Sequence, residues 1–124
     1  MDCRFCNFNE IIIAANELAF AVYDKYPVTE GHILVIPKRH VASYFDTSIE
    51  ERTAIDELLN ECKRILDEKY QPDGYNIGIN CGEAAGQTIF HVHVHLIPRY
   101  IGDVGNPRGG VRGIIPGRKD YKDD

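Results

Sequence analysis

The stretch His91-Val92-His93-Val94-His95-Leu96 alternates imidazole and apolar side chains without a break. A period of two is typical of a β-strand with one polar and one buried face. We therefore expect the three histidines on one side of a strand, with roughly 7 Å between successive members. Three of the five histidines of the chain lie in this one stretch. Such a concentration predicts imidazole chemistry, a metal site, or both.

Two kinds of chemistry fit a strand of imidazoles. A neutral imidazole is a nucleophile near pH 7, and its phosphoryl adduct is labile enough to be hydrolysed. Three imidazoles can also hold a catalytic zinc ion that keeps one position open for water, which would make hydrolysis metal-dependent. The motif alone leaves both alternatives open.

A loop of small and polar residues, 80–88, directly precedes the histidine stretch. Glycines allow backbone N–H groups to approach a ligand closely, and successive N–H groups form anion-binding nests. Asn80, Gln87 and Thr88 add neutral hydrogen-bond donors. Beside three imidazoles, this loop is better explained as a phosphate cradle than as a plain hairpin turn.

Length, composition and charge bound the class of protein. A chain of 124 residues with 44% hydrophobic and 27% charged residues is about one domain long and has an ordinary globular composition. The formal net charge of −5 argues against a nucleic-acid surface, which needs a basic stripe. We expect neither a membrane span nor a signal peptide. Four irregularly spaced cysteines favour a reducing, cytoplasmic setting over a disulfide framework.

Periodicity predicts about five strands and one long helix. Ser48 and Glu51 have the spacing of a capping box, and an apolar stripe at helical spacing follows, so we expect a helix over about 48–70 with Glu51 among the charged residues of its solvent side. Pro98 is interpreted as the end of the histidine strand. The strand-like runs cover residues 10–15, 18–23, 32–37, 75–80 and 91–96.

Cys3-Arg4-Phe5-Cys6 forms a C-x-x-C pair near the start of the chain. Such a pair is half a zinc site, a redox pair, or two unconnected thiols. A redox pair normally precedes a helix, whereas strand-like sequence follows here, and zinc needs two further ligands. Lys38-Arg39-His40 is a cationic cluster at the exit of a predicted strand, for which a solvated loop is the plain explanation.

Three motifs together resemble the histidine triad family of nucleotide hydrolases and transferases. They are the H-φ-H-φ-H-φ pattern (φ apolar) of 91–96, the stretch Gly31–Lys38, and Gly86-Gln87-Thr88. The resemblance runs from about Cys3 to Tyr100, so we expect one domain over 1–124, with a core of about 3–100 and a Gly/Pro/Arg-rich tail of about 101–124. The family implies an α+β fold, an antiparallel sheet flanked by helices, usually as a homodimer.

The resemblance assigns a role to each matching position. His93 would attack the α-phosphorus of a nucleotide, giving a nucleotidyl-histidine that is hydrolysed to a nucleoside monophosphate. His95 would assist departure of the leaving group, and His32 would belong to the array that orients the triad. Asp24 would bind the ribose hydroxyls. The other implied contacts are Asn80, Gly86, Gln87 and Thr88 for phosphate and Phe5, Phe8 and Val22 for the base.

Some members of the family also bind a structural zinc ion. The positions that match its ligands here are Cys3, Cys6, His40 and the first triad histidine, His91. The resemblance thus implies a structural zinc and no catalytic metal.

The residues after the triad, Ile97–Asp103, resemble the dinucleoside polyphosphate hydrolases of the fragile-histidine-triad type. The phosphoramidase branch tends to carry a tryptophan-containing tail, and this chain has no Trp. We expect a purine nucleotide or dinucleoside polyphosphate as substrate, with a purine nucleoside phosphoramidase as the alternative. A non-catalytic nucleotide-binding partner protein and a metal-dependent hydrolase are less favoured. Arg99 either meets the extra phosphates or forms a surface ion pair.

Overall fold

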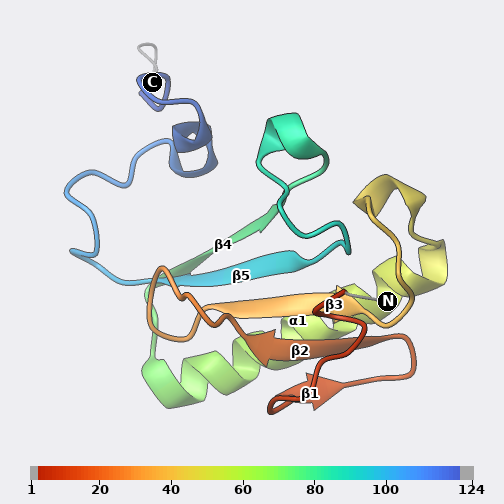
Figure 1. Ribbon diagram of the computed structural model, residues 1–124. Coiled ribbons are helices and arrows are strands. Elements are labelled where there is room, and N and C mark those ends of the chain that lie inside the picture. Colours follow the sequence, from red (N-terminus) through yellow and green to blue (C-terminus); the bar gives the residue numbers. More distant parts are fainter. Residues whose placement is uncertain (1–2, 121–124) are drawn as a thin grey trace.

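The computed structural model describes residues 3–120, which fold as one antiparallel sheet with a long helix against it (Figure 1). The sheet has the strand order β1-β2-β3-β5-β4. Its strands are β1 (Ala14–Ala15), β2 (Ala19–Tyr23), β3 (Ile33–Pro37), β4 (Gly74–Ile79) and β5 (Val94–Arg99). The helices are α1 (Ile49–Tyr70) and three short 3-10 helices, η1 (Tyr44–Asp46), η2 (Glu83–Ala85) and η3 (Gly110–Ile114). The predicted α+β fold is confirmed.

Helix α1 begins at the predicted capping box. The Ser48 hydroxyl accepts from the Glu51 N–H (3.0 Å), and the Glu51 carboxylate accepts from the Ser48 N–H (2.9 Å). The helix ends where Gln71 adopts the left-handed conformation (φ 49°). The predicted span of about 48–70 is therefore confirmed, but Glu51 is buried, contrary to its predicted place on the solvent side.

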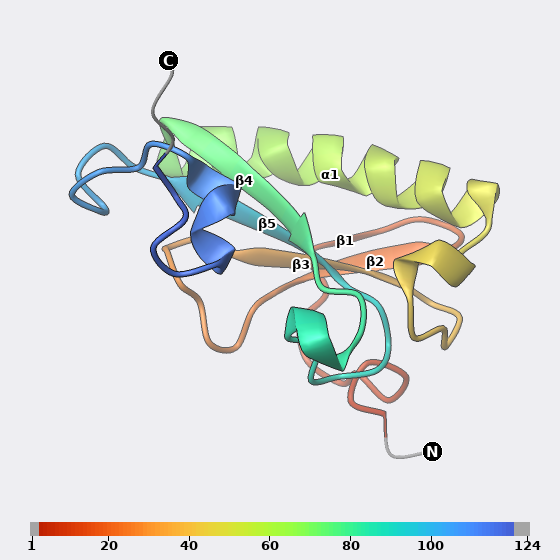
Figure 2. The ribbon, with the colours of Figure 1, turned by 90° about the horizontal axis from the view of Figure 1, so that it is seen from above.

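Each strand of the sheet divides its side chains between two faces. Helix α1 covers one face, where Ala21, Val35, Val94 and Leu96 join the main core. The opposite face carries the N-terminal segment and the loop that contains η2 (Figure 2). A second, smaller core lies there, formed by Phe5, Phe20, Val22, Leu34 and Ile36. His95 stands between two residues that face α1 and pairs with Leu34, so it belongs to this opposite face.

The histidine strand starts later than its alternation predicts. Strand β5 begins at Val94, so His91 and His93 precede it instead of lying within it. Strand β3 pairs with β5 only up to Val35↔Val94. Pro37 has no N–H for a ladder, and its carbonyl accepts from the His91 side chain instead.

Two other boundaries differ from their predictions. Strand β5 continues through Pro98, which pairs with Tyr75 of β4. Pairing with β3 stops at Leu96, so the missing N–H of Pro98 is tolerated on a side with no neighbouring strand. The first strand is reduced from 10–15 to Ala14–Ala15. Within residues 3–120, no helix is both long and apolar enough to cross a membrane.

Candidate active site and metal centre

The backbone fixes the proton of His93. Its Nδ1 lies 3.0 Å from the carbonyl oxygen of His91. A carbonyl oxygen only accepts, so Nδ1 carries the proton and the neutral ring has its lone pair on Nε2. The ring packs edge-on against Phe5, with centroids 5.1 Å apart. The contact with the His91 carbonyl thus sets which ring nitrogen of His93 carries the lone pair when the ring is neutral.

A second chain of contacts fixes the protons of His32 and His95. The Val28 N–H donates to His32 Nδ1 (3.1 Å), so the proton of the neutral His32 is on Nε2. That nitrogen lies 3.0 Å from His95 Nδ1, which therefore accepts. The remaining proton of His95 is on Nε2. Two neighbouring histidines, with ring centroids 5.2 Å apart, thus present opposite groups: His93 an acceptor and His95 a donor.

Burial favours the neutral forms of His32 and His95. His32 is 2% exposed, and desolvation lowers its pKa. The carboxylate of Asp24, whose Oδ2 lies 3.5 Å from His32 Nε2, opposes this shift. Desolvation, followed by the charges of His93 and His32, lowers the pKa of His95 to about 4. A neutral His95 can accept from His32 and donate through Nε2 at the same time.

The low pKa of His95 predicts acid sensitivity of the fold. An unfolded histidine takes up a proton near pH 6.5, but folded His95 does so only near pH 4. The unfolded state thus binds more protons in this window, and the free energy of unfolding falls as pH drops from about 6.5 towards 4. Urea unfolding at several pH values should show this loss. His95→Gln, which accepts from His32 without titrating, should show less of it, and equal pH dependence in both proteins would contradict the assignment.

The structure brings the four predicted zinc ligands together. The ligand atoms of Cys3, Cys6, His40 and His91 all lie within 4.8 Å of one another. Cys3 Sγ and Cys6 Sγ lie 3.3 and 3.5 Å from His91 Nδ1, and Cys6 Sγ lies 3.2 Å from His40 Nδ1. Tetrahedral zinc with ordinary bond lengths separates a sulfur and a nitrogen ligand by roughly 3.5 Å. These residues therefore fit a Cys₂His₂ zinc site.

His91 is oriented as a metal ligand by the backbone. Its Nε2 donates to the Pro37 carbonyl (2.7 Å), and the ring is fully buried. The lone pair of the neutral ring is then on Nδ1, the nitrogen that faces the two thiols. Desolvation also lowers the pKa of His91, which keeps it neutral.

The alternative of a catalytic three-histidine zinc site is not supported by the geometry. His91 faces the cysteines, whereas His95 faces His32 and Asp24. Among residues 3–120, no cluster of possible ligands contains His93 or joins His91 to His95. The triad is divided between the Cys/His cluster, which His91 joins, and the neighbouring imidazoles of His93 and His95.

The loop 80–88 is braced by Gln87. This side chain is 4% exposed, donates to the carbonyls of Ala42 (2.7 Å) and Ile89 (3.1 Å), and accepts from the Gly82 N–H (2.8 Å). Asn80 and Thr88 are exposed, and their side chains form no hydrogen bond with the other residues of 3–120. The phosphate role predicted for Gln87 stays a prediction, while Asn80 and Thr88 are available to a ligand.

The backbone amides of the loop are partly used. The N–H groups of Ala85 and Gln87 donate to the Gly82 carbonyl, and that of Gly86 to the Glu83 carbonyl. Gly82 and Gly86 have φ of 95° and 92°, a left-handed region that favours glycine. An anion nest at this loop would have to draw on its other amides.

The residues predicted to contact the base lie on the face of the sheet opposite α1. Phe5 and Val22 are buried in the second core, and Phe8 packs against it. One oxygen of Asp24 accepts from the Tyr26 N–H (2.9 Å).

Arg99 donates to Asp103 through two nitrogens (2.8 Å each) and to Asn76 (2.7 Å), so of its two predicted roles the structure shows the ion pair.

Sequence reasoning missed the groups that set the protons. The carbonyls of Pro37 and His91 and the N–H of Val28 belong to the backbone, which carries no residue-specific signal. It also missed the ion pair between Arg39 and Glu51. Its only signals were the cationic cluster at 38–40 and the capping box.

The chain is similar to known proteins over most of its length. Residues 7–102 match the model of the HIT domain. An uncharacterized 16.1 kDa HIT-like protein of Mycoplasma pneumoniae is 40% identical over 104 residues, which are 80% of this chain and 72% of the relative. A bis(5'-adenosyl)-triphosphatase of Dictyostelium discoideum is 40% identical over 88 residues, which are 71% of this chain and 59% of the relative.

A solved structure shares the fold. It is a Zn-bound histidine triad family protein from Mycobacterium smegmatis, with a TM-score of 0.76 and 38% identity over 83% of this chain and 78% of that one. The family match covers most of the described residues, including the triad and the loop before it. The chain is therefore a member of the histidine triad (HIT) family.

Proposed function

We propose that this protein is a nucleotide hydrolase that acts at the α-phosphate through a nucleotidyl-histidine intermediate. The carrying observation is the pair of contacts that set the protons at the triad. His93 Nδ1 faces the His91 carbonyl, which leaves the lone pair of a neutral ring on Nε2, and His95 Nδ1 faces His32 Nε2, which leaves a proton on His95 Nε2. A nucleophile beside a hydrogen-bond donor is what displacement at phosphorus requires.

In the proposed first step, His93 Nε2 attacks the α-phosphorus. A P–N bond forms, the P–O bond to the leaving group breaks, and the Nε2–H of His95 stabilises the departing oxygen. The adduct makes the His93 ring cationic, and its Nδ1–H keeps its hydrogen bond to the His91 carbonyl, which is 3.0 Å away. Water then attacks the phosphorus and forms a P–O bond, the electron pair of the broken P–N bond returns to His93 Nε2, and one proton of the water passes to solvent, which gives a nucleoside monophosphate and neutral His93.

Dinucleoside polyphosphates are the proposed substrate class. The relative from Dictyostelium is named for hydrolysis of a diadenosine triphosphate, and it shares 40% identity with this chain. The motif after the triad points the same way. A homodimer, a single domain over 1–124 and a cytoplasmic setting stay predictions.

The test is a paired assay of nucleoside monophosphate release after treatment with a chelator. One arm contains diadenosine triphosphate and the other adenosine 5′-phosphoramidate, with His93→Ala as the blank. Faster turnover of the dinucleotide supports the proposal, and faster turnover of the amidate transfers the protein to the phosphoramidases. Silence in both arms that zinc reverses would make the metal catalytic, and silence that it does not reverse would leave a nucleotide-binding protein.

Asp24 is proposed to bind the ribose hydroxyls. It lies at the end of β2, beside His32, and its carboxylate is partly exposed. We expect Asp24→Ala to raise KM for ribonucleotides by roughly tenfold, because the variant loses a carboxylate that would accept hydrogen bonds from both ribose hydroxyls. The effect on 2′-deoxy analogues should be much smaller. Steady-state kinetics on both series checks this, and an equal rise in KM would remove the ribose role.

A structural zinc ion is proposed at Cys3, Cys6, His40 and His91. The support is the closeness of the four ligand atoms, which all lie within 4.8 Å of one another, the three sulfur–nitrogen distances of 3.2–3.5 Å, and the related Zn-bound structure from Mycobacterium smegmatis. When bound, zinc would link the N-terminal segment to His40, which follows β3, and to His91, which precedes β5. No step of hydrolysis is assigned to it.

A further inference from the structure

Residues 37–42 contact the proposed zinc ligand His91, the start of the histidine stretch and the loop 80–88. The Pro37 carbonyl accepts from His91, and the Val41 carbonyl accepts from the Val92 N–H (2.8 Å). The Ala42 carbonyl accepts from Gln87, which braces the loop 80–88. The position of this segment therefore influences the metal ligands, the start of the histidine stretch and the loop at the same time.

The middle of this segment has little packing to hold it. Lys38, Arg39 and His40 are all exposed, after β3 ends at Pro37. Yet His40 Nδ1 lies 3.2 Å from Cys6 Sγ, as a ligand of the cluster must. An exposed ligand needs a neighbouring anchor to stay in place.

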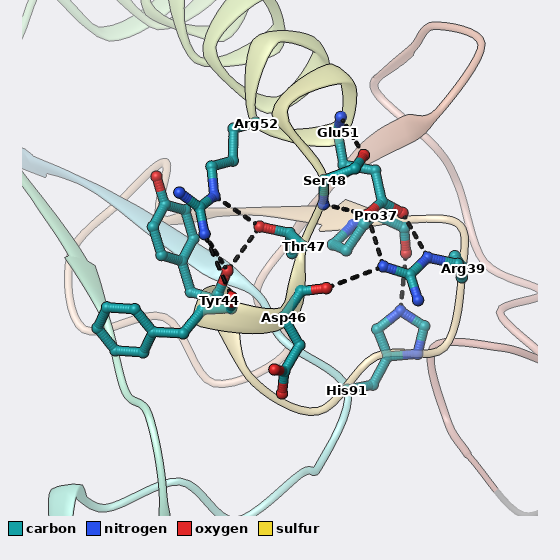
Figure 3. Close-up of polar contacts among 10 residues, drawn as sticks. Pro37, Arg39, Tyr44, Asp46, Thr47, Ser48, Glu51, Arg52 and His91 are labelled. Carbon is teal, nitrogen blue, oxygen red and sulfur yellow. Dashed lines mark hydrogen bonds and ion pairs between the residues drawn. The ribbon is translucent and has the colours of Figure 1, made fainter.

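The backbone of Lys38 and of Val41 is hydrogen-bonded to neighbouring stretches of chain, and the side-chain anchor next to His40 is a bidentate ion pair between Arg39 and Glu51 at the start of α1 (Figure 3). Arg39 Nε and an Nη donate to the two oxygens of Glu51 (3.0 and 2.8 Å), and the same Nη donates to the Asp46 carbonyl (3.1 Å). Glu51 is 4% exposed. A planar guanidinium fork fixes both distance and orientation, which a single point charge does not.

Glu51 is committed to the charged state. The hydrogen bonds from Arg39 are the main cause that lowers its pKa to about 2, and the Ser48 N–H contributes. Removing Arg39 would leave a buried carboxylate without its cationic partner, which makes the pair hard to break.

We propose that Glu51 and Arg39 are positioning residues of the metal centre, which hold His40 within reach of the two thiols by anchoring segment 37–42 to the first turn of α1. The inference rests on the zinc site put forward under the proposed function. It does not depend on hydrolase activity, because neither side chain is given a part in the reaction.

A competing explanation is that the ion pair only stabilises the helix start. Ser48→Ala separates the two. It removes the hydroxyl that accepts from the Glu51 N–H and so weakens the same capping box, but it leaves both bonds between Glu51 and Arg39 in place.

The experiment measures zinc affinity by competition with a chromophoric chelator, together with the visible spectrum of the cobalt-substituted protein. We expect Glu51→Gln and Arg39→Gln each to weaken zinc binding about tenfold and to alter the cobalt spectrum. The double variant should bind no more weakly than either single one, and Arg39→Lys should recover part of the loss. Ser48→Ala should lower the melting temperature of the metal-free protein but leave the zinc affinity within about twofold.

Three outcomes would overturn the inference. They are unchanged zinc affinity in Glu51→Gln and Arg39→Gln, an equal loss in Ser48→Ala, or no zinc uptake by the wild-type protein. The last of these rejects the zinc site itself. If Arg39→Gln fails to fold because it leaves the buried Glu51 carboxylate unpaired, Glu51→Gln decides alone, since it removes that charge. A failed hydrolase assay leaves every arm of this test unaffected.

Discussion

His93→Ala is expected to reduce nucleotide turnover by roughly 10⁴-fold or more, because it removes the atom that forms the covalent bond to phosphorus. The backbone already holds the ring in the required tautomer, with Nδ1–H on the His91 carbonyl at 3.0 Å. None of the remaining triad residues can replace it. His91 is turned towards the cysteines, and His95 uses Nδ1 to accept from His32.

Substrate binding should survive the same substitution. The proposed contacts of the nucleotide are spread over Asp24, the loop 80–88 and His95, so loss of one imidazole should change the dissociation constant by no more than about tenfold. Single-turnover kinetics and equilibrium titration with a non-hydrolysable analogue measure the two effects separately. Retained turnover would remove the covalent mechanism.

A matched control addresses the packing of His93. Its ring contacts the buried Phe5, so truncation to alanine leaves space beside the second core. His93→Asn fills more of that space and offers no nucleophilic nitrogen, so it should be as inactive as His93→Ala but closer to wild type in melting temperature. Turnover in the asparagine variant would show that the alanine variant is inactive because of a packing defect.

The parts of the fold that follow from local patterns were predictable. The capping box at Ser48 and the apolar stripe behind it placed α1 within a residue at its start. The cluster Ile33–Ile36 was predictable as a strand because its side chains are apolar on both faces. The start of β5 was not, since the alternation of His91 and Val92 continues the pattern without being part of the ladder.

The limits at the site have a different cause. The four zinc-ligand positions and the division of the triad came from the resemblance, and the structure brings those ligand atoms together. Which nitrogen of each imidazole carries the proton depends on backbone groups of Pro37, His91 and Val28. Glu51 was misplaced because helical periodicity puts a charged residue on the solvent side, whereas an ion pair with Arg39, twelve residues away in sequence, gives the buried carboxylate a cationic partner.

Loss of the proposed zinc ion is expected to lower the melting temperature by on the order of 10 °C and to change activity little. A metal present at 1,000 times its dissociation constant stabilises the folded state by about 4 kcal/mol. For a protein of this size each kcal/mol shifts the melting temperature by roughly 3 °C. The cluster joins residues 3–6 to the end of β3 and to His91, so its loss frees the N-terminal segment that carries the buried Phe5.

Turnover should be affected less than about threefold at temperatures well below melting. The proton of His93 is held by a backbone carbonyl, and His91 keeps its own bond to the Pro37 carbonyl without the metal. Scanning calorimetry and kinetics on the variant with both Cys3→Ser and Cys6→Ser, each with and without chelator, measure the two quantities. The chelator should lower the melting temperature of the wild-type protein and leave that of the variant unchanged, because the variant lacks the two thiolates of the cluster. Activity lost without a fall in melting temperature would instead place the metal in the reaction, and the triad would then have to be explained as its ligand set.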